Sequence, residues 1–155
     1  MTSFRLDGRV ALVTGAGQGL GASISIAYAE AGASVVLLGR TESYLKDTAD
    51  AIRKAGGEAS LIVCDVTNDE KLRKAFSGLD RLDILVNNAG TNFPEPFIEV
   101  SDDHLDAMLD LNVRACFVAA QAAVQVMLKS ADLAEHGASV VNMSSQMGHV
   151  GSPNR

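Results

Sequence analysis

The sequence is poor in several chemically informative residue types. Its 155 residues include no tryptophan, two tyrosines, two cysteines and three histidines. Two cysteines are too few for the disulfide framework of a small secreted domain. Both stand in apolar surroundings, so we expect Cys64 and Cys116 to be reduced core residues of a cytoplasmic protein. The histidines are scattered and form no cluster with cysteine, so we predict no metal site.

Positive charge and long apolar stretches are also scarce. The net charge is −6 and no basic run is present, which argues against nucleic acid or an anionic membrane as a partner. No continuous apolar run approaches the roughly 18 residues of a membrane span, and residues 1–8 lack the apolar region of a signal peptide. What is abundant is apolar content, at 47%. We therefore expect residues 1–155 to form a single domain with a substantial core.

Five short apolar runs alternate with helical patterns along the chain. Each run is continuously apolar, which is typical of parallel strands covered on both faces; the runs are 10–13, 34–38, 59–64, 83–86 and 139–143. With right-handed crossovers, this alternation predicts an α/β fold, a doubly wound Rossmann-type parallel sheet with helices on both faces. The expected strand order is 3-2-1-4-5.

Helical periodicity and capping residues place the intervening helices. The first helix carries an apolar stripe through Leu20, Ile24 and Tyr28, which we expect to face the sheet. The pattern Thr67-x-x-Glu70 predicts a capping box at the third helix. The fourth helix should open at Ser101, and its expected buried stripe contains Leu105, Met108 or Leu109, Asn112, Cys116, Ala119 and Ala123.

A glycine-rich turn joins the first strand to the first helix. Two spacings overlap there: Gly17-x-Gly19-x-x-Ala22 and Thr14-Gly15-x-x-x-Gly19-x-Gly21. Glycines allow positive φ and leave no Cβ to block a ligand, and the turn leads to a helix N-terminus that favours anions. No lysine follows as in a P-loop. The pattern predicts a site for the pyrophosphate of a dinucleotide, and a flexible connecting loop is the alternative.

The end of the second strand bears on the choice of dinucleotide. An acidic residue about 20 positions beyond the glycines would bind the ribose 2′-hydroxyl of NAD. Gly39 and Arg40 stand there instead. A guanidinium can bind a 2′-phosphate in a bidentate manner, so we predict NADP(H), with NAD(H) as the alternative. Under the second interpretation Arg40 only begins the solvated turn before the next helix.

Motifs at several strand ends agree with one family. The spacing Thr14-Gly15-x-x-x-Gly19-x-Gly21 resembles the glycine motif of the short-chain dehydrogenase/reductases, and Asn87-Asn88-Ala89-Gly90 matches the Asn-Asn-Ala-Gly motif of that family without change. The resemblance runs from about Gly8 to Arg155. It implies an NAD(P)-dependent oxidoreductase that transfers hydride between nicotinamide and a carbonyl or alcohol substrate. The implied cofactor-binding residues are Thr14, Gly15, Gly17, Gln18, Gly19, Leu20, Gly21, Arg40, Asp65, Val66, Asn88, Ala89 and Gly90.

The resemblance also implies individual roles. Asp65 would accept a hydrogen bond from the adenine amino group, and Gln18 stands where NADP-dependent members often have a basic residue. Ser145, the second serine of a pair followed by Gly148, would be the catalytic serine. Asn112 would hold a water that connects the active site to solvent, whereas a satisfied core asparagine is the alternative. His104 has no such counterpart and is expected to be a solvated residue of its helix.

The chain departs from the family in one respect. Members place a proton-donating tyrosine in Tyr-x-x-x-Lys beyond the serine, but Tyr28 and Tyr44 are followed four residues later by Gly32 and Thr48. We therefore expect an N-terminal fragment, truncated after about five strands and inactive alone, from a homotetramer or homodimer that packs its fourth and fifth helices together. A non-catalytic dinucleotide-binding or assembly module is the alternative function. The substrate wall would include residues Thr91, Asn92, Phe93 and Phe97.

Overall fold

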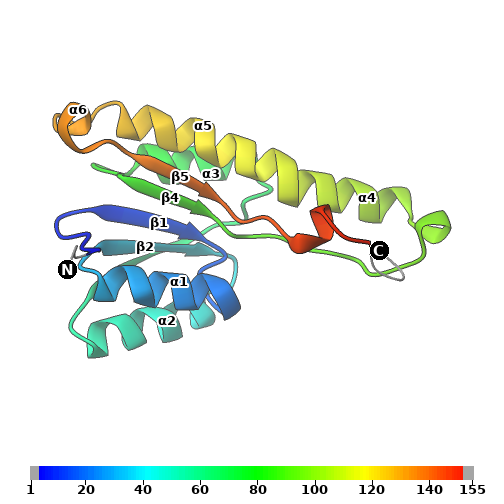
Figure 1. The fold of residues 1–155 in the computed structure, drawn as a ribbon, viewed down its shortest axis with the longest axis horizontal. Coiled ribbons are helices and arrows are strands. Elements are labelled where there is room, and N and C mark those ends of the chain that lie inside the picture. Colours follow the sequence, from blue (N-terminus) through cyan, green and yellow to red (C-terminus); the bar gives the residue numbers. More distant parts are fainter. Residues whose placement is uncertain (1–3, 152–155) are drawn as a thin grey trace.

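The computed structural model describes residues 4–151 and contains one five-stranded sheet (Figure 1). Every neighbouring pair of strands is parallel, and the order is β3-β2-β1-β4-β5, as predicted. The predicted strand ends are displaced by no more than one residue. The strands are β1 (Val10–Thr14), β2 (Ser34–Gly39), β3 (Glu58–Val63), β4 (Ile84–Asn87) and β5 (Ser139–Asn142).

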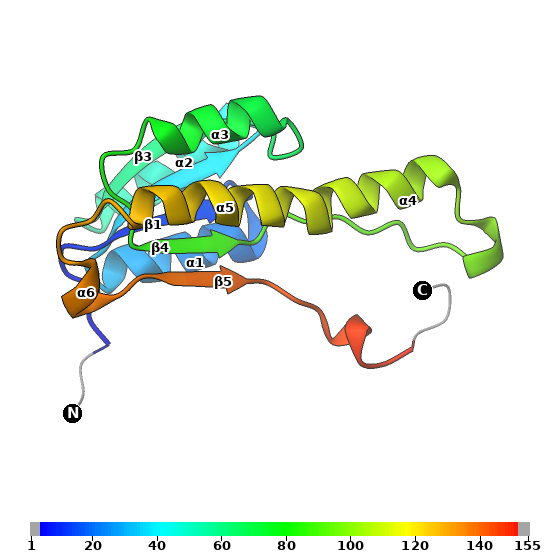
Figure 2. The ribbon, with the colours of Figure 1, turned by 90° about the horizontal axis from the view of Figure 1, so that it is seen from above.

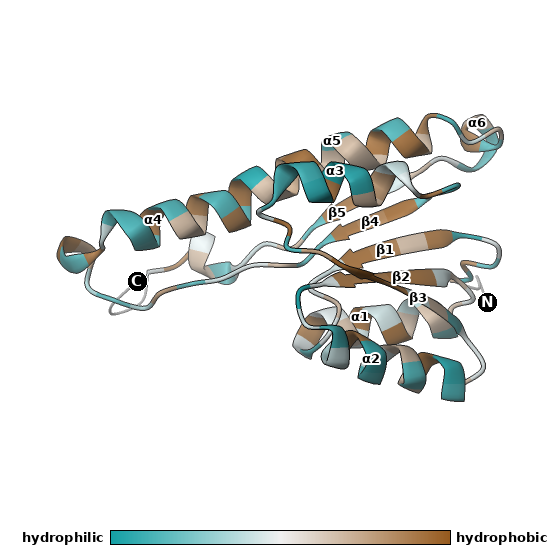
Figure 3. Ribbon diagram, turned by 180° about the vertical axis from the view of Figure 1, so that it is seen from behind, coloured by the Kyte–Doolittle hydropathy of each residue, from teal (hydrophilic) through white to brown (hydrophobic). Residues whose placement is uncertain are grey.

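Helices cover both faces of the sheet and enclose two separate cores. One core lies under α1 (Gly19–Glu30) and α2 (Glu42–Lys54), and the other under α3 (Asp69–Ser77) and α5 (Ala115–Met127). Within β1, Leu12 belongs to the second core, whereas Ala11 and Val13 belong to the first. Successive side chains of a strand point to opposite faces, so a strand between two cores must be continuously apolar. Figure 3 shows this apolar character along the strands and polar residues on α2 and α3.

The edge strand β5 does not follow the prediction that every strand is covered on both faces. All four of its residues are exposed, and Val140 and Val141 each keep 38% of their surface. β5 pairs with β4 on one side only. Its apolar sequence resembles that of the central strands, so periodicity did not distinguish it from them.

The first helix follows the predicted stripe only in part. Its fully buried residues are Gly21, Ser25 and Ala29. Ile24 and Tyr28 of the predicted stripe are partly buried against the same core, whereas Leu20 is 67% exposed. Small side chains let the helix axis lie close to the sheet, and the Ser25 hydroxyl donates a 2.7 Å hydrogen bond to the Gly21 carbonyl. This bond satisfies the one polar group on the buried face.

Side-chain caps begin the third and fourth helices. The N-cap of α3 is Asn68, whose Oδ1 accepts a hydrogen bond from the Lys71 N–H at 3.0 Å, so the predicted capping box at Thr67 is wrong. Ser101 caps α4 (Asp102–Leu109) as predicted and accepts from the His104 N–H at 3.2 Å. An asparagine is as good a cap as threonine, so the sequence offered two adjacent candidates.

A π-helical segment, η2 (Asp110–Arg114), joins α4 and α5 into one continuous helix that projects beyond the sheet (Figure 2). α5 carries seven buried residues and α4 none. Leu105 and Leu109 are therefore exposed, contrary to the predicted stripe, because α4 lies past the strands that would cover it. By length and composition alone, Asp102–Met127 could cross a membrane, although it contains no continuous apolar run of that length. Its second half packs against α3 and β4.

Three short elements complete the described chain. The 3-10 helix η1 (Phe97–Glu99) precedes α4, the four-residue α6 (Leu133–His136) precedes β5, and the 3-10 helix η3 (Gln146–Gly148) follows β5. Both η1 and η3 lie at the end of the molecule to which the strands point (Figure 1).

A buried aspartate links several chain segments at the amino ends of the strands. Asp83 keeps 3% of its surface and accepts hydrogen bonds from Arg81 at 2.7 and 2.9 Å, from Arg9 at 3.1 Å and from the Val10 N–H at 2.8 Å. Arg81 also donates to Asp132 at 2.8 Å. Burial raises the pKa of Asp83, but hydrogen bonds from Arg81, Val10 and Arg9 outweigh it, so its pKa is lowered.

We expect this carboxylate to make the fold sensitive to acid. A depressed pKa in the folded state contributes stability that is fully present above the unfolded value of about 4 and is lost as pH falls through the folded value. The midpoint of urea unfolding should therefore fall as pH decreases below about 4. Asp83→Asn should cost about 3–5 kcal/mol at neutral pH and flatten this profile. Asp50→Asn, which removes an exposed pair with Arg53, is the control; an equally flat profile there would contradict the assignment.

Candidate dinucleotide site

A cavity of about 360 Å³ lies where β1, β2, β3 and β4 end. Open parallel sheets bind ligands at the carboxyl ends of their strands, near the reversal of strand order, which here falls between β1 and β4. The lining includes ten of the predicted cofactor residues: Gly15, Gly17, Gln18, Gly19, Arg40, Asp65, Val66, Asn88, Ala89 and Gly90. It also includes six residues that sequence reasoning did not select: Gly39, Thr41, Tyr44, Leu45, Cys64 and Leu111.

Five predicted site residues do not line the cavity: Thr14, Leu20, Gly21, Asn112 and Ser145. Leu20 is exposed in the first turn of α1. Thr14 and Gly21 do not line the cavity themselves, but they contact residues that do. The missed residues Thr41, Tyr44 and Leu45 share one signal, since all belong to the start of α2 directly after Arg40.

Thr14 and Asn88 fasten the ends of β1 and β4 together. The buried Thr14 hydroxyl accepts hydrogen bonds from the N–H groups of Asn88 and Ala89, both at 3.0 Å. The Asn88 side-chain amide donates to the Thr14 carbonyl at 3.0 Å. The neighbouring Asn87 amide donates to Asn142 Oδ1 of β5 at 2.9 Å. These bonds satisfy polar groups at the strand ends and fix the floor of the cavity.

Packing requires three of the motif glycines. A Cβ added to Gly21 would stand 2.2 Å from the Gly15 carbonyl oxygen. A Cβ added to Gly17 would stand 2.9 Å from Tyr44 Cβ, and one added to Gly15 would stand 3.1 Å from Ala89 Cα. These glycines therefore allow α1, α2 and β4 to approach the turn closely. Only a glycine can occupy these positions without displacing the neighbouring backbone.

Gly19 differs from the other three, because its constraint comes from the backbone and not from neighbours. Its φ is +57°, and nothing lies within 4 Å of the place where a Cβ would stand. It is the first residue of α1 and lines the cavity. The first N–H groups of a helix have no intrahelical partner and favour an anion. The open space at Gly19 thus fits a phosphate that contacts the helix backbone directly.

The start of α2 supplies a cation and a second helix N-terminus. Arg40 is exposed and has no ion-pair partner among residues 4–151, and Thr41 is the N-cap of α2 without a side-chain capping bond. Gly39 stands where an acidic residue would bind the ribose of NAD. A Cβ added to Gly39 would stand 3.2 Å from Leu45 Cδ2. A larger residue there would press on the core side chain of α2. At the end of this strand, no carboxylate stands next to Arg40 that would repel a bound anion.

Cys64 and Asp65 line the cavity directly after the end of β3. Asp65 Oδ1 accepts hydrogen bonds from the Thr67 N–H at 3.0 Å and the Thr67 hydroxyl at 2.9 Å, which fix the carboxylate. Its Oδ2 accepts no bond from any residue between 4 and 151, so this oxygen of a residue that lines the cavity remains available as an acceptor. Burial and the charge of Asp65 raise the pKa of the Cys64 thiol, which therefore stays protonated at neutral pH.

Asn112 is exposed in the π-helical segment and not buried in a stripe. Its side chain nevertheless has both partners that an amide needs. Its Oδ1 accepts from the Thr91 N–H at 2.9 Å, and its Nδ2 donates to the Thr91 carbonyl at 2.9 Å. Asn112 therefore holds the backbone of the segment that leaves β4, directly after Gly90.

Ser145 begins η3, three residues beyond the last residue of β5. Its hydroxyl accepts a hydrogen bond from the Met147 N–H at 3.2 Å and so caps this short helix. Ser144 takes part in no side-chain hydrogen bond within residues 4–151. In the same described range, no group of three His, Cys, Asp or Glu side chains could hold a metal ion.

The family model of the short chain dehydrogenases matches residues 9–155. An uncharacterized oxidoreductase of Mycobacterium tuberculosis is 38% identical over 95% of this chain and 56% of its own length. The 7alpha-hydroxysteroid dehydrogenase of Escherichia coli is 39% identical over 83% of this chain and 51% of its own length. The chain thus spans little more than half the length of these relatives.

Solved structures agree with these sequence matches. A 7 alpha-hydroxysteroid dehydrogenase complexed with NADH and 7-oxo glycochenodeoxycholic acid has a TM-score of 0.87 and 34% identity, over 98% of this chain and 59% of that one. A structure from Beutenbergia cavernae, described as an NAD(P)-dependent gluconate 5-dehydrogenase with bound NADP, has a TM-score of 0.87 and 35% identity, over 98% and 60% of the chains. The chain belongs to the short-chain dehydrogenase/reductase family of NAD(P)-dependent oxidoreductases.

Proposed function

We propose that the full-length protein is an NADP(H)-dependent alcohol dehydrogenase or carbonyl reductase. The observation that carries this proposal is the cavity at the carboxyl ends of β1 to β4. Its lining contains Gly19, with open space at its missing Cβ, and Arg40, which has no ion-pair partner within residues 4–151. A dinucleotide matches both features, because it carries phosphates at its centre and, in NADP, on the adenosine ribose. The NADP in the Beutenbergia cavernae structure supports this choice, and the NADH in the 7 alpha-hydroxysteroid dehydrogenase is the alternative.

Residues of the cavity and residues beside it have separate roles in this proposal. The N–H groups at the start of α1 bind the pyrophosphate, the Arg40 guanidinium binds the 2′-phosphate, and Asp65 accepts a hydrogen bond from the adenine amino group. The bound cofactor supplies or accepts hydride at its nicotinamide ring. Ser145 orients the substrate oxygen. Asn112 sets the path of the backbone at Thr91, next to the same strand ends.

A second candidate is a non-catalytic dinucleotide-binding or assembly module. The cavity at the ends of β1 to β4 supports this candidate as well, because a dinucleotide site does not by itself require catalysis. Assays of ketone reduction by the full-length protein distinguish the two. Binding of NADPH without reduction of any ketone would favour the module, whereas turnover would favour the enzyme.

We also propose a homodimer or homotetramer that packs the long helix against its counterpart. The supporting observation is a row of exposed apolar side chains along α4, η2 and α5. Phe117 is 68% exposed at the centre of this row, and its other members are Leu105, Leu109, Val113, Val124 and Leu128. Contiguous exposed apolar surface of this kind marks protein interfaces.

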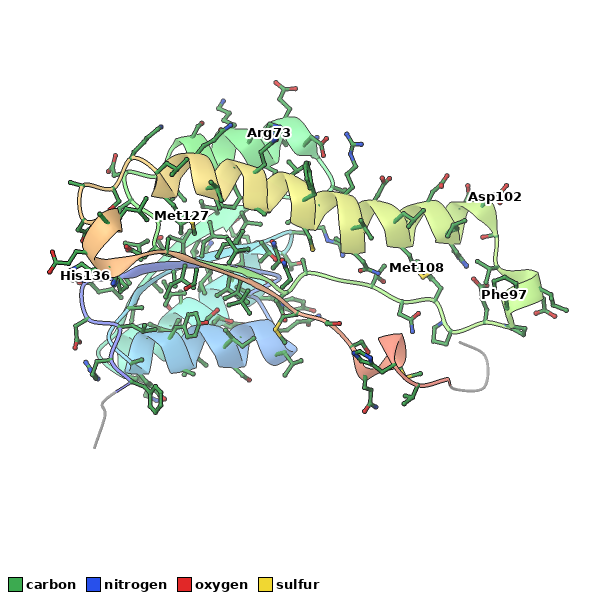
Figure 4. The ribbon with its side chains drawn as sticks, turned by 45° about the horizontal axis from the view of Figure 1, so that its top comes forward. Arg73, Phe97, Asp102, Met108, Met127 and His136 are labelled. Atoms are coloured by element: carbon green, nitrogen blue, oxygen red, sulfur yellow. The ribbon has the colours of Figure 1, made fainter. Side chains whose placement is uncertain are left out.

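Cofactor choice is tested by Arg40→Ala. We expect the variant to bind NADP⁺ about 10- to 150-fold more weakly, because a charged hydrogen bond contributes about 1.5–3 kcal/mol. Its affinity for NAD⁺ should stay the same, since NAD⁺ has no 2′-phosphate. Isothermal titration calorimetry with both dinucleotides measures this difference. Arg73→Ala on α3, outside the cavity lining (Figure 4), is the control; unchanged NADP⁺ affinity in Arg40→Ala would contradict the proposed cofactor.

A further inference from the structure

The segment that leaves β4 runs alongside α4. It lies between α4 and the chain that follows β5, and it reaches η1 at the far end of the molecule, where Phe97 and Asp102 lie (Figures 2 and 4). Alternate residues along it differ in burial. Thr91, Phe93 and Glu95 are half-buried, whereas the residues between and after them are exposed: Asn92, Pro94 and Pro96. An extended chain points successive side chains to opposite sides, so this segment has two distinct faces.

His104, in the first turn of α4, holds two of the half-buried residues. Its imidazole stacks on the Phe93 ring, with centroids 4.2 Å apart and planes inclined by only 2°. Its Nδ1 lies 2.9 Å from Glu95 Oε1, where an N–H at this position donates to the carboxylate. The backbone of His104 is itself fixed, because its N–H donates to the capping hydroxyl of Ser101. His104 is therefore not the solvated residue that the sequence suggested.

Asn112 holds the third half-buried residue, through its two hydrogen bonds to the Thr91 backbone. Asn112 and His104 thus bind three alternate residues of the segment to one side of the long helix. The Phe93 ring consequently packs against His104. Phe97 is 89% exposed and lies beyond the segment, in η1. The expected aromatic substrate wall of Phe93 and Phe97 is not assembled in the described chain.

The alternation of side chains along the segment then determines which of them is not held against α4. Asn92 lies between two fastened residues, Thr91 and Phe93, and is exposed, so alternation puts it on the face away from α4. In Figure 2 the chain that follows β5 runs on the side of this segment opposite α4, and Ser145 belongs to that chain, three residues after β5. A carboxamide both donates and accepts hydrogen bonds, so it matches a hydroxyl or carbonyl group.

We propose that His104 is a positioning residue for substrate recognition, and that Asn92 is the side chain it positions. Asn92 binds a second oxygen of the substrate, apart from the oxygen at the reacting carbon. The substrate class is therefore one with two oxygen functions, such as a diol or a hydroxyketone. This inference rests on the proposed dehydrogenase function and assigns specificity within the same site.

The experiment compares cyclopentanol with trans-cyclopentane-1,2-diol, which differ by one hydroxyl, as substrates of the full-length protein. We expect the wild type to favour the diol about tenfold or more in kcat/KM, as one hydrogen bond allows. Asn92→Ala should remove this preference mainly through KM. His104→Ala should remove it equally, and the double variant should lose no more than either single one, because both changes remove the same contact.

Two further variants separate positioning from general destabilisation. His104→Phe retains a stacked ring and loses the bond to Glu95, so it should keep part of the preference for the diol. His136→Ala, at the opposite end of the molecule (Figure 4), should leave it unchanged. A preference that survives His104→Ala, or losses that multiply in the double variant, would overturn the proposal.

NMR of the Phe93 ring distinguishes this proposal from the proposed function on which it rests. We expect His104→Ala to shift the Phe93 ring resonances, because the ring loses its stacked imidazole, while binding of NADP⁺ is unchanged. If the wild type turns over neither compound with NADP⁺ or NAD⁺, the dehydrogenase assignment fails for this substrate class and Asn92 has no role in it. If the Phe93 ring resonances are the same in His104→Ala as in the wild type, the fastening itself is wrong.

Discussion

Replacing Ser145 with alanine in the full-length protein is expected to lower kcat by about 10²-fold or more, as for other positioned hydrogen-bond donors. The serine follows β5, whose residues pair in register with those of β4 up to Asn142. In the proposed mechanism its hydroxyl holds the substrate oxygen and stabilises the charge that develops there during hydride transfer. Steady-state reduction of a ketone by NADPH measures the effect on kcat.

The neighbouring serine provides the control. Ser144→Ala should cost far less, because we assign no contact with the substrate to Ser144. Ser145→Ala also removes the cap of η3, so NADPH affinity and thermal stability are measured in parallel to separate this structural loss from catalysis. A larger fall in kcat for Ser144→Ala would mean that the catalytic position is assigned one residue too far along the chain.

Gly19→Val is expected to abolish binding of both dinucleotides. Valine is strained at a φ of +57°, and its branched side chain would fill the space where the pyrophosphate meets the helix backbone. Calorimetry should detect no binding of NADP⁺ at concentrations that saturate the wild type. Circular dichroism establishes whether the variant is folded.

Gly8 offers a matched control for the strain. Its φ is +72°, nothing lies within 4 Å of its missing Cβ, and it precedes β1 outside the cavity lining. Gly8→Val therefore introduces a similar backbone cost without filling the site, and it should bind NADP⁺ normally. Normal binding by a folded Gly19→Val protein would place the phosphate site elsewhere.

The order of the sheet and most of the cavity lining could be predicted because both depend on local sequence. Continuous apolar runs mark strands with a core on each face, and the carboxyl ends of parallel strands must meet at one edge. Ten residues selected from the motifs line one cavity for this reason. Gly19 and Arg40 are identified by residue type, since one permits an unusual φ and the other carries an unneutralised charge.

Long-range packing decides the features that could not be predicted. Which face of α1 is buried depends on how closely the helix approaches the sheet, and small residues such as Gly21 permit this approach while Leu20 stays exposed. Asn112 and His104 have partners in a segment that precedes α4, and neither pairing has a periodic signal. β5 is exposed in a chain that spans little more than half the length of its relatives, and its apolar composition is that of a strand covered on both faces.

The connectivity of the sheet has a consequence for the order in which the chain folds. Strands β2 and β3 meet through residues 24 positions apart, as at Ser34 and Glu58, whereas β1 and β4 meet through residues 74 apart, as at Thr14 and Asn88. Closing a longer loop costs more entropy, and contacts between distant residues form more slowly. The half made of β1, β2 and β3 supplies most of the strand residues in the core under α1 and α2, to which β4 adds Ile84 and Val86. We expect this half to form the folding nucleus, so that the phosphate-binding turn is structured before the strands that carry Asn88 and Ser145 join the sheet.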